Sequence, residues 1–237
     1  MMTRRTLVAG AALAALSACS RPLAPDLRPD LTGQTPPMPE PIPPLPAFYG
    51  AVLDEPYPVP AIPEGVVAQR LWRQEVPNPF PDQPEGTIIV NPDAANLHLV
   101  GADGTALRYG VCVGADGFAW SGDAVVQFTR AWPRWKAPDS MVARWPQFEP
   151  YSVANGGMAP GPGNPLGARA LYLFQNGNDT LYRIHGACEP EYLGQAASSG
   201  CIRLLDQDII DLEKRTRHAA KVVVLPSVRR TEVASLY

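Results

Sequence analysis

The chain has 237 residues, with 20 basic and 23 acidic side chains and a formal net charge of −3. It has no basic patch or run, which argues against a nucleic-acid partner. It also has no stretch of 18 or more apolar residues, which excludes an ordinary membrane-spanning helix. Of the 28 prolines, 18 fall between Pro22 and Pro84. The composition predicts a proline-rich leading segment followed by one domain of about 150 residues, long enough to bury a core.

The first residues have the pattern of an export signal. Arg4 and Arg5 precede an apolar stretch over 7–18, too short to span a bilayer but typical of a signal peptide that ends at residue 18. Small residues then precede Cys19, as in the bacterial lipobox, so we expect lipidation of the Cys19 thiol. The alternative is an ordinary signal with an incidental cysteine. The paired arginines partly resemble a twin-arginine signal.

These signals predict a protein that faces the periplasm. The lipid on Cys19 would anchor it to a membrane, and the following Ser20 favours the outer membrane over the inner one. Stable disulfides persist in that oxidising compartment.

The proline-rich segment covers residues 19–84. Each proline lacks a backbone N–H and fixes φ, so neither a helix nor a central strand persists there. We expect an extended polyproline-II linker, with the part between Phe48 and Trp72 apolar enough to pack on the domain. Docking of a proline-recognising partner is the alternative role. The folded domain is expected over 85–226, followed by a C-terminal tail over 227–237.

Short apolar and β-branched runs separated by turn residues predict a mainly β domain. The expected strands cover 87–90, 97–100, 106–113, 124–129, 168–174, 180–184 and 221–225. Asn178 and Asp179 are expected to form a turn. One helix is expected to start at Asp206 as its cap and to run through Arg217, and a short one to cover 140–144. The Gly-, Pro- and Asn-rich stretch 154–167 is typical of a long loop.

A histidine and a cysteine sixteen residues apart form the densest group of reactive side chains. His185 ends an expected strand, and Cys201 lies in a turn of small residues. A cysteine nucleophile needs a base within hydrogen-bonding reach, exposure, and backbone N–H groups aimed at the developing oxyanion. His185 can be the base, and Gly200 and Cys201 can offer the N–H groups. The carbonyl of Gly186 can hold the imidazole in one tautomer.

Other chemistries fit this pair less well. A zinc site from His185, Cys188 and Cys201 lacks a fourth ligand and the usual paired spacing. Papain-like enzymes place Cys before His in the chain, and caspase-like enzymes place His about 50 residues upstream of Cys. A dithiol redox role for Cys188 and Cys201 is at odds with their wide spacing. On spacing alone, purely structural roles for both side chains stay open. We expect neither a metal nor an organic cofactor.

The context of the pair is recognisable. His185-Gly186, followed after a short gap by SSGCIR at 198–203, resembles the signature of the L,D-transpeptidase catalytic domain, the YkuD/ErfK family of bacterial cell-wall enzymes. Three more segments resemble that family: GVCVG at 110–114, GPGNPLGA at 161–168 and YRIHG at 182–186. The similarity spans residues 85–226. It implies a mainly β, sandwich- or barrel-like domain with one or two short helices.

The resemblance also implies a reaction. Cys201 would attack the diaminopimelate carbonyl of a peptidoglycan tetrapeptide stem, with loss of D-Ala, and His185 would take and return the proton. If an amine of a second stem then attacked, the product would be a 3–3 cross-link. If an amine of an envelope protein attacked instead, that protein would become attached to the stem. Hydrolysis would make the chain an L,D-carboxypeptidase. The rival from another class is a non-catalytic peptidoglycan-binding lipoprotein.

Three residues are expected to contact the substrate by this resemblance: Arg203, Ser199 and Asn164. Arg203 could bind a substrate carboxylate or brace the loop through a buried salt bridge. Ser199 occupies the position where many family members have a second histidine. Whatever that histidine does in those members, it is in doubt whether this chain has an equivalent. His98 and His218 are expected to be structural or surface residues.

Two cysteines remain after Cys19 and Cys201 are assigned. In an oxidising compartment, the spare pair Cys112 and Cys188 suggests a disulfide, which would brace the loop after His185. Two reduced, buried thiols are the alternative.

Overall fold

The computed structural model describes residues 43–114, 120–195 and 201–228. The expected signal peptide, Cys19, Ser199, Gly200 and most of the expected tail lie outside the described residues. Within those ranges, no helix combines the length and the apolar character that crossing a bilayer would require.

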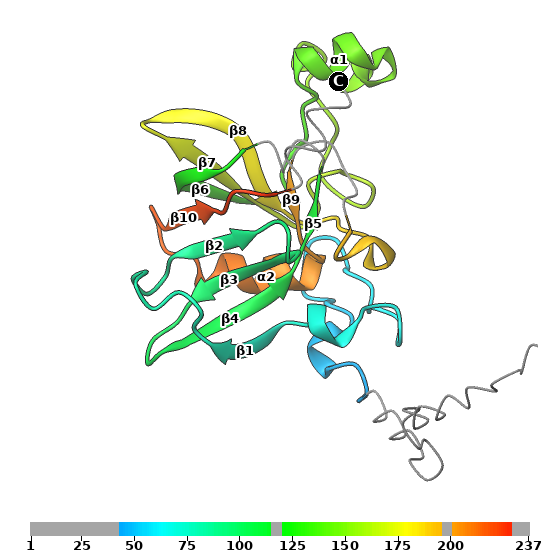
Figure 1. The fold of residues 1–237 in the computed structure, drawn as a ribbon. Helices are drawn as coiled ribbons and strands as arrows, with labels where there is room; N and C mark the ends of the chain where they lie inside the picture. The colour runs from blue at the N-terminus through cyan, green and yellow to red at the C-terminus, as the bar shows by residue number, and fades with distance from the viewer. Residues whose placement is uncertain (1–42, 115–119, 196–200, 229–237) are drawn as a thin grey trace, which may run out of the picture. The chain divides into compact units, whose positions relative to one another are not determined.

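Ten strands form one sheet in the order β1-β4-β3-β2-β10-β6-β7-β8-β9-β5. Their bounds are β1 Gln74–Pro77, β2 Ile88–Asn91, β3 Asn96–Val100, β4 Thr105–Gly110, β5 Cys112–Val113, β6 Gly122–Ala131, β7 Arg169–Gln175, β8 Asn178–His185, β9 Ile202–Arg203 and β10 Lys221–Val224. All pairings are antiparallel except β10 with β2 and β8 with β9. The sheet bends, so that β1 to β4 and β6 to β8 form two layers (Figure 1).

The helices are few and short, which confirms the expected mainly β class. The α-helices are α1 Asp139–Arg144 and α2 Asp206–Arg215, and the 3₁₀ turns are η1 Ala47–Tyr49, η2 Gln69–Leu71, η4 Pro146–Tyr151 and η5 Pro190–Tyr192. The connection from β6 to β7 contains α1 and η4 and extends away from the sheet (Figure 1). The expected loop 154–167 forms the second part of this connection.

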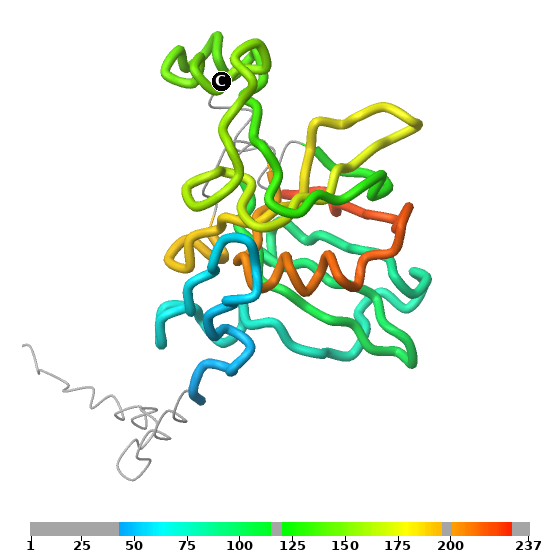
Figure 2. The backbone as a smooth tube through the Cα atoms, turned by 180° about the vertical axis from the view of Figure 1, so that it is seen from behind, coloured from blue at the N-terminus to red at the C-terminus, as the bar shows by residue number. Residues whose placement is uncertain are grey.

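The core lies between the sheet and α2. Helix α2 buries Ile209 and Leu212 against strand residues such as Leu171 and Ile184, all of them fully buried. Full burial of one such side chain contributes about 1.5–3 kcal/mol. Figure 2 shows α2 crossing in front of the strands, with the blue N-terminal segment beside it. Helix α2 therefore contacts both the β-sheet that includes the His185 strand and the first described part of the chain.

Residues 43–84 fold with the domain, and they include the part between Phe48 and Trp72 that is expected to pack on it. Tyr49, Val67 and Leu71 are at most 4% exposed, and Gln74–Pro77 joins the sheet as β1. The prolines stop regular helices, but the apolar side chains between them still bury enough surface to hold the segment. Proline is tolerated in β1 because this strand lies at the edge of the sheet.

Two local expectations were wrong. The turn between β7 and β8 is at Asn176 and Gly177, with φ of 51° and 78°, while Asn178 already begins β8. An Asn-Gly pair readily adopts the positive φ values that a tight hairpin needs. Asp206 is the first residue of helix α2 and not its cap, which is Leu205, and the helix ends at Arg215 and not at Arg217.

Candidate active site

His185 ends β8 and pairs with a strand on each side. Its partners are Ala170 on the antiparallel β7 and Arg203 on the parallel β9. Ile184 and Ile202 point into the core, so the next residues, His185 and Arg203, project from the opposite face of the sheet. The imidazole is only 3% exposed. Rigid sheet pairing on both sides therefore fixes the position of this histidine.

One hydrogen bond defines the imidazole tautomer. Nδ1 of His185 lies 2.9 Å from the carbonyl oxygen of Gly186. Since a carbonyl can only accept, Nδ1 carries the proton and Nε2 is left as an acceptor. The carbonyl is the one expected from the sequence.

The charge state of His185 follows from its surroundings. Burial lowers the pKa of His185 to about 3, and the positive charges of Arg203 and Arg183 act in the same direction. Backbone hydrogen bonds at Gly186 and Leu166 oppose this shift but do not outweigh it. The imidazole is therefore neutral at physiological pH, the form that can accept a proton.

Asp206 holds the backbone directly before β7 and shortly after the end of β8, the strand that carries His185. Its Oδ1 accepts from the N–H of Ala168 at 2.8 Å and from the N–H of Ala187 at 3.1 Å. The N–H of Gly186 in turn donates to the carbonyls of Leu166 and Arg169, both at 3.1 Å. Burial raises the pKa of Asp206, although both N–H bonds favour its carboxylate.

Glycine is required beside this carboxylate. A Cβ on Gly186 or on Gly167 would clash with Oδ1 of Asp206. The sequence indicates Asp206 only as a helix cap, because an acidic residue at a helix start is common. Its role in holding the turn after His185 appears only when segments distant in sequence are brought together.

Cys201 lies directly before β9, is partly exposed and is not part of a disulfide. Its carbonyl accepts from the N–H of Gly114 at 3.3 Å. Strand β9 pairs with β5 on one side and with β8 on the other. His185 pairs with Arg203, and residues 201 and 203 project from the same face, so the parallel register of β8 and β9 places the cysteine on the same face of the sheet as His185.

Arg203 is a half-buried cation on the same face of the sheet. Burial lowers the pKa of Arg203, while the negative charges of Cys201 and Glu189 raise it. Both groups must lie close to the guanidinium to have this effect. A positive charge beside a cysteine favours its thiolate form. Arg203 is thus located where it can act on the thiol, whereas the sequence indicates only substrate binding or loop bracing.

Asn164 does not have the substrate-binding position expected from the sequence. Its side chain is buried, and Nδ2 donates to three carbonyls of the surrounding loop, those of Pro133, Met158 and Ala159. Its Oδ1 accepts from the N–H of Leu166 at 2.9 Å. The amide is fully used inside the protein, so Asn164 shapes the loop. The other expected substrate contact, Ser199, and the expected oxyanion residue Gly200 lie outside the described residues.

Cys112 and Cys188 form a disulfide, with Cα atoms 6.3 Å apart. The bond joins β5 to the segment that follows His185, and the N–H of Cys188 donates to the carbonyl of Leu204 at 3.0 Å. A disulfide sulfur cannot be a thiolate ligand. The zinc site considered from His185, Cys188 and Cys201 is therefore incompatible with this structure.

Comparison with known proteins identifies the domain. The family model for the YkuD L,D-transpeptidase catalytic domain matches residues 85–224, more than half of the chain. YcfS of Escherichia coli strain K12, described as a probable L,D-transpeptidase, is 28% identical over 155 residues, covering 62% of this chain and 46% of that protein. The matches to curated relatives span only 36–46% of those proteins.

Two solved structures are also similar. A probable carnitine operon oxidoreductase, caia, from Brucella melitensis has 40% identity and a TM-score of 0.47, over 67% of this chain and 96% of that one. The C442S mutant of the Enterococcus faecium L,D-transpeptidase has 16% identity and a TM-score of 0.42, over 61% of this chain and 51% of that one. On the match to the family model, this chain belongs to the YkuD family of L,D-transpeptidase catalytic domains.

Proposed function

We propose that the chain is a peptidoglycan L,D-transpeptidase with Cys201 as its nucleophile. The observation that carries the proposal is the state of His185. It is neutral, its Nδ1–H donates to Gly186, which leaves Nε2 as the acceptor, and the strand register places Cys201 on the same face of the sheet. A buried neutral imidazole held in one tautomer is the form that a general base requires.

In the acylation step, Sγ of Cys201 attacks the carbonyl carbon at the L-centre of a diaminopimelate residue. Nε2 of His185 takes the thiol proton, and the carbonyl electrons move onto oxygen. Collapse of this intermediate breaks the bond to D-Ala, whose nitrogen receives the proton from Nε2. The products are free D-Ala and a thioester on Cys201. The positive charge of Arg203 favours the thiolate that attacks.

In the second step, an amine attacks the thioester and gives its proton to Nε2. The carbon–sulfur bond breaks, and the proton returns to the sulfur. If the amine belongs to a second stem, the product is a 3–3 cross-link; if it belongs to an envelope protein, that protein becomes attached. Hydrolysis requires only that water replace the amine.

We also propose that the mature chain begins at a lipidated Cys19 and is tethered by residues 20–42 in the periplasm. The basis is the sequence pattern alone. Mass spectrometry of the N-terminal peptide from native membranes tests it: a diacylglyceryl-modified Cys19 is expected, and an unmodified mature N-terminus would contradict it.

Product analysis tests the reaction. The full chain is incubated with a disaccharide-tetrapeptide, beside a Cys201→Ala variant, and the products are weighed by mass spectrometry. A dimer that has lost one D-Ala, formed only when Cys201 is present, is the expected result. A tripeptide alone would assign the chain as a carboxypeptidase. Unchanged tetrapeptide in both samples would contradict cross-linking activity.

Two histidine substitutions distinguish loss of the base from the loss of any imidazole. His185→Gln should lower the rate about 10²–10⁴-fold, the usual contribution of a general base. His218→Gln is the matched control, because His218 is exposed after the end of α2 and should leave the rate unchanged.

A further inference from the structure

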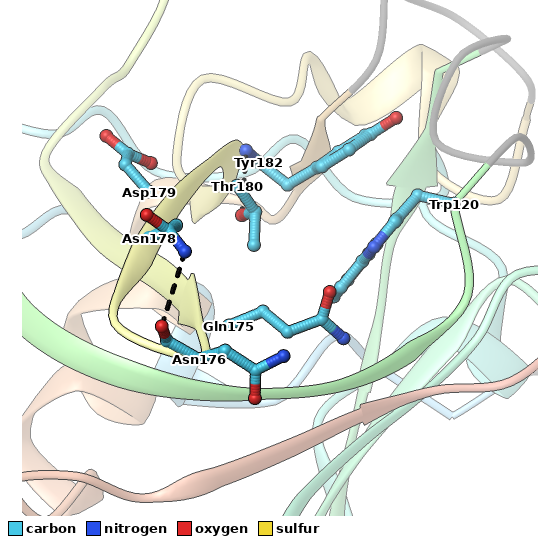
Figure 3. Close-up of a pocket in the computed structure, with 7 residues that line it drawn as sticks. All are labelled: Trp120, Gln175, Asn176, Asn178, Asp179, Thr180 and Tyr182. Carbon is cyan, nitrogen blue, oxygen red and sulfur yellow. Dashed lines mark hydrogen bonds between the residues drawn. The ribbon is translucent and has the colours of Figure 1, made fainter.

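A pocket of about 350 Å³ lies on the β7–β8 hairpin, outside the group formed by His185 and Cys201. This volume lies within the usual range for small-molecule sites. Figure 3 shows two aromatic rings, Trp120 and Tyr182, bordering it, with the side chains of Gln175, Asn176 and Asn178 around the rest. The pocket thus combines aromatic surface with uncharged polar groups.

The aromatic wall is rigid. The rings of Trp120 and Tyr182 are stacked, with centroids 5.1 Å apart and planes 18° from parallel. Both are half-buried and pack against the main core. A ligand that meets this wall needs a flat apolar surface, and it encounters rings that the core already holds in place.

Polar atoms around the pocket are available to a ligand. Gln175 uses Nε2 to donate to the carbonyl of Asp123 at 2.8 Å, and Asn178 uses Nδ2 to donate to the carbonyl of Asn176 at 3.3 Å. Among the residues that the structure describes, their side-chain oxygens and the whole side-chain amide of Asn176 have no protein partner. They offer three acceptors and one NH₂ donor to a ligand.

The charge at the pocket is balanced. The carboxylate of Asp179 receives two hydrogen bonds from the guanidinium of Arg183, both at 2.7 Å. The carboxylate is thereby neutralised at the rim, which favours an uncharged ligand over a stem peptide with its free carboxylates. The pocket therefore fits a neutral ligand with a flat apolar face and with hydroxyl and amide groups around its edge. A pyranose sugar that carries an acetamido group has these features.

We propose that this pocket binds an N-acetylated sugar ring of the peptidoglycan glycan strand; the identity of the polymer rests on the proposed function. The pocket and the catalytic histidine share β8: Tyr182 is three residues before His185, about 10 Å along the strand, and its side chain is on the opposite face. Strand β9 pairs with β8 only at Ile184 and His185, so no described strand covers the edge of β8 beside the pocket. A glycan held there can pass its stem peptide across this edge to Cys201.

Binding of a peptide-free oligosaccharide tests the site directly. Chitotetraose is titrated into the full chain by calorimetry, and again into the double variant Gln175→Ala/Asn178→Ala. The wild-type chain should bind, and loss of two hydrogen bonds should weaken binding about tenfold. The matched control is Gln127→Ala, an exposed glutamine on the neighbouring β6, which should bind like the wild type. No binding by the wild type, or equal binding by the double variant, would overturn the proposal.

Turnover separates this proposal from the proposed function. Release of D-Ala is measured with a disaccharide-tetrapeptide and with the free tetrapeptide. The double variant should lose kcat/KM about tenfold for the disaccharide-tetrapeptide, through a higher KM, and keep the wild-type value for the free tetrapeptide. Equal losses on both substrates would overturn the sugar site. If the wild type releases no D-Ala from either substrate, the proposed function is contradicted. The chitotetraose titration would still show whether the pocket binds a sugar.

Discussion

A carboxylate oxygen of Asp206 fills the place beside Gly186 where any other residue would put its side chain. The same oxygen accepts from the backbone N–H groups of Ala168 and Ala187. The carbonyl of Gly186 then fixes His185. Asp206 therefore positions the imidazole through the backbone, without contact to the ring.

Removing this carboxylate should loosen the histidine. Asp206→Ala leaves two partly buried N–H groups without their acceptor, which should lower the free energy of unfolding by about 2–4 kcal/mol. Asp206→Asn keeps the accepting oxygen and should restore most of the stability and of kcat. Thermal unfolding and the rate of D-Ala release measure both effects. If the Asn variant is as impaired as the Ala variant, the charge of Asp206 matters and the hydrogen-bond account is wrong.

His185 should make the protein sensitive to acid. Its folded pKa of about 3 lies below the ordinary value of 6.5, because burial disfavours the charged ring. The unfolded chain therefore binds an extra proton between these values, and stability contributed by the neutral ring is lost as the pH falls below about 6.5. The difference in unfolding free energy between wild type and His185→Gln should shrink steadily from pH 7 to pH 4, measured by urea titration.

His98 provides the comparison for this titration. Burial and the charge of Arg108 lower the pKa of His98 to about 4, so His98→Gln should show a trend of the same sign. A wild-type-to-variant difference for His185 that stays constant over the whole pH range would contradict the burial of a neutral ring.

The disulfide should stabilise the domain measurably. Cys112 and Cys188 are 76 residues apart, and loss of such a bond typically costs about 2–5 kcal/mol. Dithiothreitol should therefore lower the melting temperature of the wild type and leave the Cys112→Ala/Cys188→Ala variant unaffected. In a stricter test, the wild type is reduced while unfolded, refolded and melted again. An unchanged melting temperature would argue against the disulfide.

The segment before the β-sheet core should be part of the stable unit. Glu55 receives hydrogen bonds from Arg169 at 2.5 and 3.0 Å and from the Trp132 indole at 2.8 Å, and the Glu55 and Arg169 side chains are only about 10% exposed. Glu55→Ala should lower the unfolding free energy by about 3–5 kcal/mol, because it leaves a buried guanidinium without its closest partner.

The matched control is another glutamate in an ion pair. Glu85 pairs with Arg217 at the surface, where the two side chains are 50% and 69% exposed. Glu85→Ala should cost less than about 1 kcal/mol, since water screens the pair. Equal effects of the Glu55 and Glu85 substitutions would mean that residues 43–84 do not pack as the structure places them.

Much of the fold is predictable from local patterns. β2, β3 and β7 are mainly apolar runs bounded by turn residues, and such runs specify core strands directly. β1 contains Glu75 and Pro77, and β9 has two residues, so their pairing depends on the partners that the rest of the fold supplies. No local pattern marks either strand.

The candidate site also has one part that is predictable from the sequence and one part that is not. His185 and its Gly186 carbonyl are adjacent in the chain, so their relation can be expected from the sequence. Asp206 reaches residues 19 and 38 positions away, and Asn164 turns its amide inward to a carbonyl 31 positions away. Contacts at such separations depend on how the loops are folded together, which the motif alone does not contain.

Intact-protein mass spectrometry tests the central claim most directly. The full chain is mixed with disaccharide-tetrapeptide, quenched in acid within seconds, and weighed, and the site of any adduct is mapped by peptide digestion. The account predicts a mass increase equal to the disaccharide-tripeptide acyl group, located on Cys201 and absent from Cys201→Ala. An unmodified Cys201 while D-Ala is released, or an adduct on another residue, would contradict Cys201 as the nucleophile.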